Sequence, residues 1–138
     1  MATPIEVQLI LCDAAQADQA GKVHMLGAGW SITGTPTSHA VAVLIKVPWD
    51  RANQKLPMRL QLLDSDGHPV LLPSPNGATT IEQAGDIEVG RPAGVAAGSM
   101  LDAAFALNVP PLPLAPGRYE WRLELAEFTY STSFTVRG

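Results

Sequence analysis

The strongest constraint on the fold is a two-residue alternation of apolar and polar side chains near the C-terminus. Every second residue from Tyr119 to Leu125 is apolar, and charged residues stand between them. The same period continues from Phe128 to Val136, with serines and threonines between the aromatic residues. This period is typical of a strand that packs one face on a core and turns the other to water. The two runs therefore predict a hairpin that turns at residues 126–127.

Shorter runs of the same kind predict strands over most of the chain. Residues 5–11 and 58–62 alternate in this way, whereas residues 40–48 are apolar on both faces, which indicates a central strand covered on two sides. Further candidate strands lie at 22–33, 70–72, 79–89 and 101–109. About eight or nine short strands between Gly, Pro and Asp turns predict an all-β fold. We expect one domain over residues 1–138, an antiparallel β-sandwich of immunoglobulin-like or Greek-key type.

Helical signals are few. Asp50 is expected to cap a short turn over residues 51–54, and the alanine-rich segment 13–20 is expected to form another turn. Residues 73–78 and 90–99 are rich in Gly, Pro and small residues, and we expect them to be exposed connections.

The proline-rich run 109–116 has two interpretations. It has the composition of an exposed polyproline ligand, but such a run is more often an extended crossover between two sheets. We expect the crossover, packed on the core through Leu112 and Leu114.

A corner motif follows this run. Pro116, Gly117 and Tyr119 resemble the corner that precedes a core strand in immunoglobulin-like and fibronectin-like sandwiches. In those domains a tyrosine hydroxyl bonds back to the backbone of the preceding loop. The resemblance is architectural, because the paired cysteines of antibody domains are absent.

Composition excludes several classes of function. The 138 residues hold 9 Lys and Arg against 13 Asp and Glu, a net charge of −4, whereas binding to nucleic acid or an anionic membrane needs a concentrated positive face. The single cysteine, Cys12, excludes an intrachain disulfide and a cysteine zinc cage, and its apolar strand predicts a buried structural thiol. No apolar run reaches transmembrane length, and no Lys or Arg precedes the run 5–12, so we expect a cytoplasmic protein.

No metal site is predicted. The histidines His24, His39 and His68 lack ligand spacing, and we expect three unrelated surface or loop residues. The segment 64–67, Asp-Ser-Asp-Gly, has the start of a calcium loop but not its later ligands, so a hairpin turn explains it better.

No catalytic residue or cofactor site is predicted either. The chain has no Gly-x-Ser-x-Gly elbow, and Glu120 and Glu124 alternate with arginines, as on a solvated strand face. Gly27 and Gly29 do not form a phosphate loop, because strand-like residues follow them instead of a helix. They indicate a bulge or a close approach of two backbones.

Two tryptophans are the candidate binding residues. Trp30 and Trp49 each lie beside chain-breaking residues, where a tryptophan most often caps the end of a core. Their second interpretation is an interaction or ligand surface, for which Trp30, Trp49 and Asp50 are the candidates.

Several short motifs carry a resemblance over residues 5 to 136. They are Asp13-Ala14-Ala15-Gln16, Gly21-Lys22, Leu26-Gly27-Ala28-Gly29-Trp30, Val47-Pro48-Trp49-Asp50 and Pro116-Gly117-Arg118-Tyr119-Glu120-Trp121. With these motifs the chain resembles an uncharacterised bacterial family of small all-β proteins. The resemblance implies the sandwich fold and adds no catalytic residue.

Together these observations predict a non-enzymatic interaction or accessory module of a bacterial cytoplasm. We expect a homo-oligomer formed through sheet edges or faces, and an unidentified protein partner is a further expectation. The alternative is a small-ligand binding protein that stacks a sugar or a lipid-like molecule on Trp30 or Trp49. A third class, an enzyme with dispersed carboxylates, needs a deep pocket that holds at least two acidic or histidine side chains.

Overall fold

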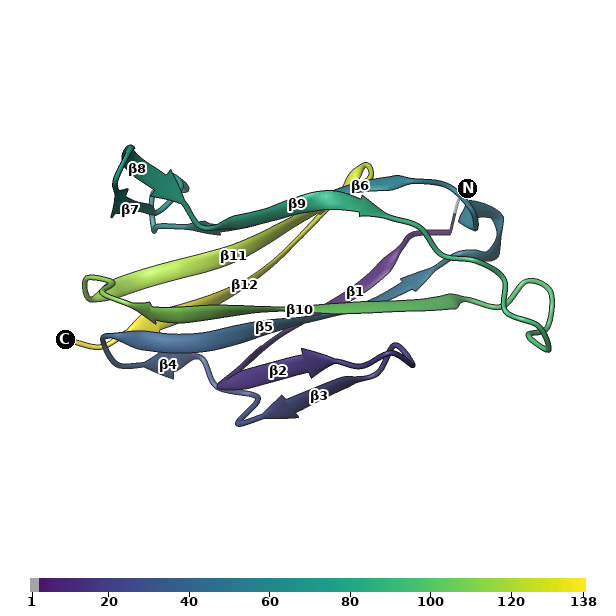
Figure 1. Ribbon diagram of the computed structural model, residues 1–138, viewed down its shortest axis with the longest axis horizontal. Helices are drawn as coiled ribbons and strands as arrows, with labels where there is room; N and C mark the ends of the chain where they lie inside the picture. The colour runs from purple at the N-terminus through teal and green to yellow at the C-terminus, as the bar shows by residue number, and fades with distance from the viewer. Residues whose placement is uncertain (1–2) are drawn as a thin grey trace.

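The computed structural model describes residues 3–138 as two mainly antiparallel sheets packed face to face (Figure 1). The smaller sheet has three strands, in the order β1 (Glu6–Cys12), β5 (Thr37–Val47) and β10 (Leu101–Leu112). The larger sheet has five strands, in the order β4 (Ile32–Thr33), β12 (Phe128–Val136), β11 (Gly117–Leu125), β6 (Leu56–Leu63) and β9 (Glu82–Ile87). The prediction of an all-β sandwich is confirmed.

Two hairpins and one turn of 3₁₀ helix complete the chain. The hairpins are β2 (Ala14–Ala17) with β3 (Val23–Leu26), and β7 (Leu71–Ser74) with β8 (Gly77–Thr80). The turn, η1, spans Trp49–Arg51. The described residues thus hold 12 strands, more than the sequence predicted. Within them, no helix has the length and apolar character needed to cross a membrane.

The C-terminal hairpin follows the alternation in the sequence. β11 and β12 pair in continuous register from Gly117 opposite Val136 to Leu125 opposite Phe128. The chain reverses at Ala126, whose φ is +53°. Tyr119, Trp121, Leu123 and Leu125 are buried between the sheets, as predicted. The period of two therefore located both strands and the face that packs on the core.

The central strand β5 is covered on both faces. Its inward residues, such as Val41, Val43 and Ile45, lie in the main core between the two sheets. Its outward residues Ala40 and Ala42 are also fully buried, in a second and smaller cluster. This confirms the prediction from the double-sided apolar pattern at 40–48.

The sandwich is closed along one side and open along the other. On the closed side, β1 lies next to β12, and the Tyr130 hydroxyl donates a hydrogen bond to the carbonyl oxygen of Ile5. On the other side lie β9 and β10, each an edge strand of its sheet.

Two segments expected to lack strands form hairpins. The prediction of a turn over 13–20 is wrong, because β2 pairs with β3 over Ala14–Ala17. The prediction of an exposed connection over 73–78 is also wrong, because β7 pairs with β8 there. Pro75 and Asn76 form the tip of this hairpin, and Gly77 supplies the positive φ (+114°) that a tight turn favours.

The segment 22–33 is two strands and not one. The chain leaves β3 at Gly27, whose φ is +62° and where an added Cβ would lie 2.1 Å from Oδ2 of Asp13. The Asp13 amide donates to the carbonyls of Leu26 (2.9 Å) and Gly27 (3.2 Å). The glycine therefore marks the close backbone approach that the sequence indicated.

Asp50 does not cap a turn. The residue before η1 is Pro48, no side chain caps the turn, and Asp50 lies within it. The segment 109–116 also differs in part, because β10 extends to Leu112 through a register shift after Val109. Leu112 and Leu114 are buried and the chain then passes to the other sheet, as expected of a crossover.

Candidate functional site

The outer face of the three-stranded sheet is built in rows of three side chains, one from each strand. The register of β1 and β10 on β5 aligns four successive rows on this face. The rows are Glu6–Lys46–Asp102, Gln8–Leu44–Ala104, Ile10–Ala42–Ala106 and Cys12–Ala40–Asn108. The face therefore changes from charged at one end to small and mostly apolar at the other, where Asn108 is the one polar side chain of the last row.

The β2–β3 hairpin covers the apolar end of this face. Ala15, Val23 and Met25 pack on the last two rows and form the second cluster with them. The amide of Asn108 fixes the hairpin, because its Oδ1 accepts from the Ala15 N–H (3.1 Å) and its Nδ2 donates to the Ala15 carbonyl (2.8 Å). A single side chain thus imitates the bonds of a neighbouring strand.

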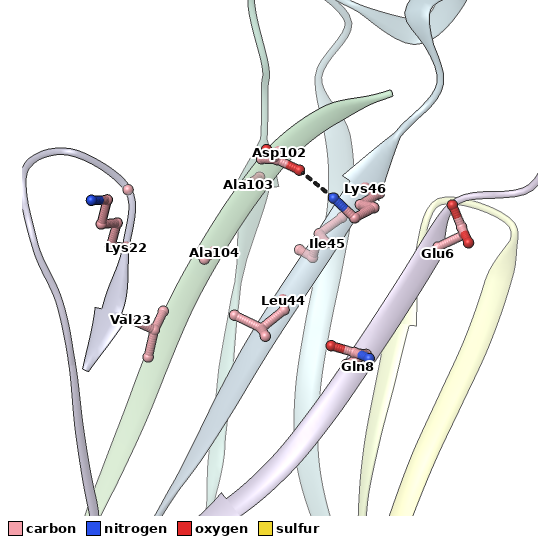
Figure 2. Close-up of a pocket in the computed structure, with 11 residues that line it drawn as sticks. Glu6, Gln8, Lys22, Val23, Leu44, Ile45, Lys46, Asp102, Ala103 and Ala104 are labelled. Carbon is pink, nitrogen blue, oxygen red and sulfur yellow. Dashed lines mark hydrogen bonds and ion pairs between the residues drawn. The ribbon is translucent and has the colours of Figure 1, made fainter. Parts of the chain in front are cut away.

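The uncovered half of the face is a groove of about 490 Å³, which we call the outer groove. Figure 2 shows Leu44 and Ala104 along its floor, with Lys22 and Val23 on the hairpin to one side. Glu6 and Gln8 extend from β1 on the opposite side, so polar side chains border an apolar floor on both sides. The volume falls within the range of small-molecule sites.

Among the described residues, some charged residues around the outer groove form ion pairs and others do not. Lys46 Nζ donates to Asp102 Oδ1 at 2.8 Å, and this hydrogen bond raises the pKa of Lys46. Both side chains are more than half exposed, so the pair adds little stability. Within residues 3–138, Lys22 and Glu6 make no ion pair. These two residues are the free charges of the groove.

Comparison with known families gives a match over residues 8–137, to a family of unknown function, DUF6941. The match spans nearly the whole chain. The chain belongs to this family. Its description agrees with the uncharacterised family expected from the sequence, and it assigns no activity to the DUF6941 fold. A comparison with curated proteins finds no match.

Among solved structures, the DUF6941 chain is similar to a family 123 glycoside hydrolase from Clostridium perfringens, described for glycolipid glycan hydrolysis. The two share 11% identity at a TM-score of 0.36, over 95% of this chain and 27% of the hydrolase chain. The chain thus spans about a quarter of that enzyme's length. A similarity this low carries no argument about the DUF6941 protein.

The candidate residues Trp30, Trp49 and Asp50 do not lie together in the DUF6941 fold. The Trp30 ring packs edge-on against His39 (5.7 Å between centroids), near the start of β5. Trp49 and Asp50 follow the other end of β5, and Asp50 is exposed. The Arg91 guanidinium covers the Trp49 ring at 4.5 Å and donates to the Trp49 carbonyl. Neither tryptophan lines the outer groove, and together they form no single surface.

The predicted corner has the geometry of a sandwich corner. Gly117 begins β11 directly after Pro116, and the Tyr119 hydroxyl donates to the carbonyl oxygen of Ala115 at 2.7 Å. Burial raises the pKa of Tyr119, and its ring stacks on Phe134. The corner ties the crossover to the first strand of the C-terminal hairpin.

Removing the Tyr119 hydroxyl should weaken this corner. We expect Tyr119→Phe to lower the free energy of unfolding by about 1 kcal/mol, because the ring stays and one net hydrogen bond is lost. Urea unfolding followed by circular dichroism measures the difference. Tyr130→Phe removes the hydrogen bond of the half-buried Tyr130 hydroxyl to Ile5 and is the comparison, with a similar expected loss. An unchanged midpoint for Tyr119→Phe would contradict the role of the corner.

The three histidines do not come together in space, and the prediction of a surface or loop position is wrong for His39. His24 is exposed and bonds to Asp18 at 2.8 Å, which lowers the pKa of Asp18. His39 was expected at the surface, yet it is 1% exposed, because it lies among the aromatic rings of the main core. Its Nε2 accepts a hydrogen bond from Trp121 Nε1 at 3.0 Å, and burial lowers its pKa to about 4. It is a neutral core residue.

The acidic turn of the DUF6941 protein has the structure of a turn. Asp64 Oδ1 accepts from the backbone N–H of Asp66 (2.9 Å) and of His68 (3.0 Å). Ligand atoms of these three residues lie within 4.8 Å of one another, but they are largely exposed and Asp64 is already engaged by the backbone. The Asp and Gly residues are thus explained by the tight turn itself.

Two further sequence interpretations agree with their surroundings. Cys12 is fully buried in the second cluster, and this burial raises the pKa of its thiol. Glu120 pairs with Arg122 at 2.9 Å on the outward face of β11, beside Glu124. That face is charged and solvated.

The sequence did not identify the residues of the outer groove, because they become neighbours only when β1, β5 and β10 are placed side by side.

Proposed function

We propose that this DUF6941 protein is a non-enzymatic interaction module and that two copies associate through the outer groove. The proposal is carried by the placement of the two free charges. Lys22 stands on the hairpin side of Leu44, whereas Glu6 stands on the β1 side (Figure 2). A surface with opposite charges on either side of an apolar centre is complementary to itself.

The expected assembly has a two-fold axis that passes near Leu44. Such an axis exchanges the two sides of the groove, so Lys22 of one copy faces Glu6 of the other, twice in each dimer. The apolar floor of Leu44 and Ala104, with Val23 beside it, then lies at the centre of the interface, where burial contributes most. The polar residues form its rim.

The setting we propose is a bacterial cytoplasm. Cys12 is buried and unpaired, which fits a reducing compartment. The non-enzymatic character is likewise a proposal. It is supported by three groups of residues that already have structural partners: the buried histidine, the acidic turn and the charged strand face.

A charge exchange tests the dimer. We expect Lys22→Glu to weaken self-association by at least about tenfold, because each interface then holds two pairs of like charges. The double variant Lys22→Glu with Glu6→Lys restores opposite charges and should recover most of the association. Sedimentation equilibrium over a range of concentrations measures both dissociation constants.

The control variant is Lys55→Glu, which makes the same change in net charge at an exposed site outside the groove. It should dimerise like the natural protein. A mass of 14.6 kDa at every concentration, or equal association of Lys22→Glu and the natural protein, would contradict the proposal. Native mass spectrometry that finds a bound small molecule, lost in Leu44→Glu, would favour the ligand-binding class instead.

A further inference from the structure

The open side of the sandwich, between β9 and β10, carries a hollow at the edge of the main core. The hollow has a volume of about 360 Å³ and is lined by β9 and by Ala103, Ala104 and Phe105 of β10, with Ile45 and Met58 at its base. Figure 1 shows the two edge strands running in opposite directions across the molecule. They belong to different sheets and do not pair with each other. We call this hollow the open seam.

The outer edge of β9 presents unpaired backbone groups. On its inner side β9 pairs with β6, and Leu62 N donates to the carbonyl of Ile81 at 3.0 Å, in the register that places Met58 opposite Gly85. Opposite residues of an antiparallel pair exchange hydrogen bonds at every second position. Glu82, Ala84 and Asp86 therefore direct their N–H and C=O groups away from β6. Pro57, which has no N–H to donate, lies opposite Asp86, at a position that exchanges no hydrogen bonds with β9.

Gly85 leaves space for a side chain from elsewhere. It lies on the core-facing side of β9, opposite Met58, and a Cβ added to it would meet nothing within 4 Å. Across the seam Ala103 is also small, and Phe105 is only partly buried. The seam therefore lacks one bulky apolar side chain at a place where the neighbouring strand has free hydrogen-bonding groups.

The charges of β9 oppose pairing with a second copy. In an antiparallel pair of two β9 strands centred on Ala84, Glu82 of each copy would lie opposite Asp86 of the other. Like charges directly opposite each other destabilise strand pairing. Glu82 is already paired with Arg59 at 2.7 Å, whereas Asp86 and the nearby Glu88 have no ion pair within residues 3–138. The edge is therefore suited to a strand with basic residues.

We propose that the β9 edge binds an extended, basic segment of another protein, with one bulky apolar side chain inserted over Gly85 into the open seam. The partner's backbone pairs with Glu82, Ala84 and Asp86. Because side chains of a strand alternate, its lysines or arginines face Asp86 and Glu88 on the outer face while its apolar residues face the seam. This site is separate from the outer groove.

The probe is a blocked, fluorescein-labelled synthetic peptide in which lysine alternates with valine, with phenylalanine at the centre. We expect saturable binding by fluorescence anisotropy. A peptide with glutamate in place of every lysine should bind at least about tenfold more weakly, because like charges then face each other. Lys22→Glu, which alters only the outer groove, should bind the basic peptide like the natural protein.

Two variants test the seam and the edge separately. Gly85→Val places a valine side chain of the protein itself in the hollow. The φ of residue 85 lies outside the region that favours glycine, so we expect no fall in the melting temperature. Ala84→Pro removes only an outward N–H and keeps the bonds to β6. Each should weaken binding by at least about tenfold.

Equal binding of the basic and acidic peptides, or binding by Gly85→Val as tight as by the natural protein, would overturn the proposal. So would self-association that Ala84→Pro abolishes, because a second copy would then occupy the edge. If Lys22→Glu abolishes the dimer formed through the outer groove, peptide binding at the β9 edge should be unchanged. The two proposals therefore succeed or fail separately.

Discussion

Trp121→Ala is expected to lower the free energy of unfolding by about 3–5 kcal/mol, the largest effect of any single change we consider. Trp121 is fully buried on β11 between the two sheets, and it donates a hydrogen bond to His39. The substitution removes the apolar contacts of the indole, leaves a cavity and deprives a buried acceptor of its donor. Urea unfolding followed by far-ultraviolet circular dichroism gives the difference.

Two further variants separate the contributions. Trp121→Phe keeps an aromatic ring in the core but leaves His39 Nε2 without its donor, so a smaller loss of about 1–3 kcal/mol is expected. Trp49→Phe changes a partly exposed ring and should cost about 1 kcal/mol or less. A loss below about 1 kcal/mol for Trp121→Ala would contradict the packing described here.

Acid should destabilise the fold through His39, over a window set by its two pKa values. Burial lowers the pKa of His39 from 6.5 to about 4. Between these values the unfolded chain binds a proton that the folded chain does not, so stability falls as the pH falls. The stability is fully present above pH 6.5 and decreases towards pH 4. The loss amounts to about 3 kcal/mol over the window.

His39→Gln isolates this effect, because glutamine does not titrate and keeps an acceptor for Trp121 Nε1. Unfolding free energies of the two proteins are measured from pH 7 to 4, and their difference is plotted against pH. We expect the natural protein to lose more stability than the variant, by about 3 kcal/mol. Parallel curves would show that His39 has the same pKa in the folded and unfolded states, and would contradict its burial as a neutral residue. The carboxylates contribute equally to both curves.

The parts of the fold that the sequence predicted are those with a strict local period. The run from Tyr119 to Leu125 specifies its own buried face, and the double-sided run at 40–48 indicates a strand with cover on both sides. In both cases the information lies in neighbouring residues, because side-chain direction in a strand depends only on position along it. The buried faces followed directly from this.

The missed features depend on contacts between distant segments. Residues 14–17 have no strand period, and they form β2 because β3 and the Asn108 amide satisfy their backbone. His39 has the sequence context of a surface residue, but β5 carries it between Trp30 and Trp121. The outer groove needs three strands in register, and the open seam needs two sheets in place. No local pattern encodes either of them.

The unequal covers of β5 have a consequence for how the molecule opens. The hairpin β2–β3 holds its cluster mainly through alanines, Cys12, Val23 and Met25, whereas the opposite face of β5 is held by leucines and aromatic rings. Small side chains bury little apolar area, so the hairpin can detach at a lower free energy than the sheets can separate. We therefore expect the amide hydrogens of β2 and β3 to exchange with solvent through partial opening, and those of β11 to exchange only on global unfolding. One strand thus divides the protein into two levels of protection.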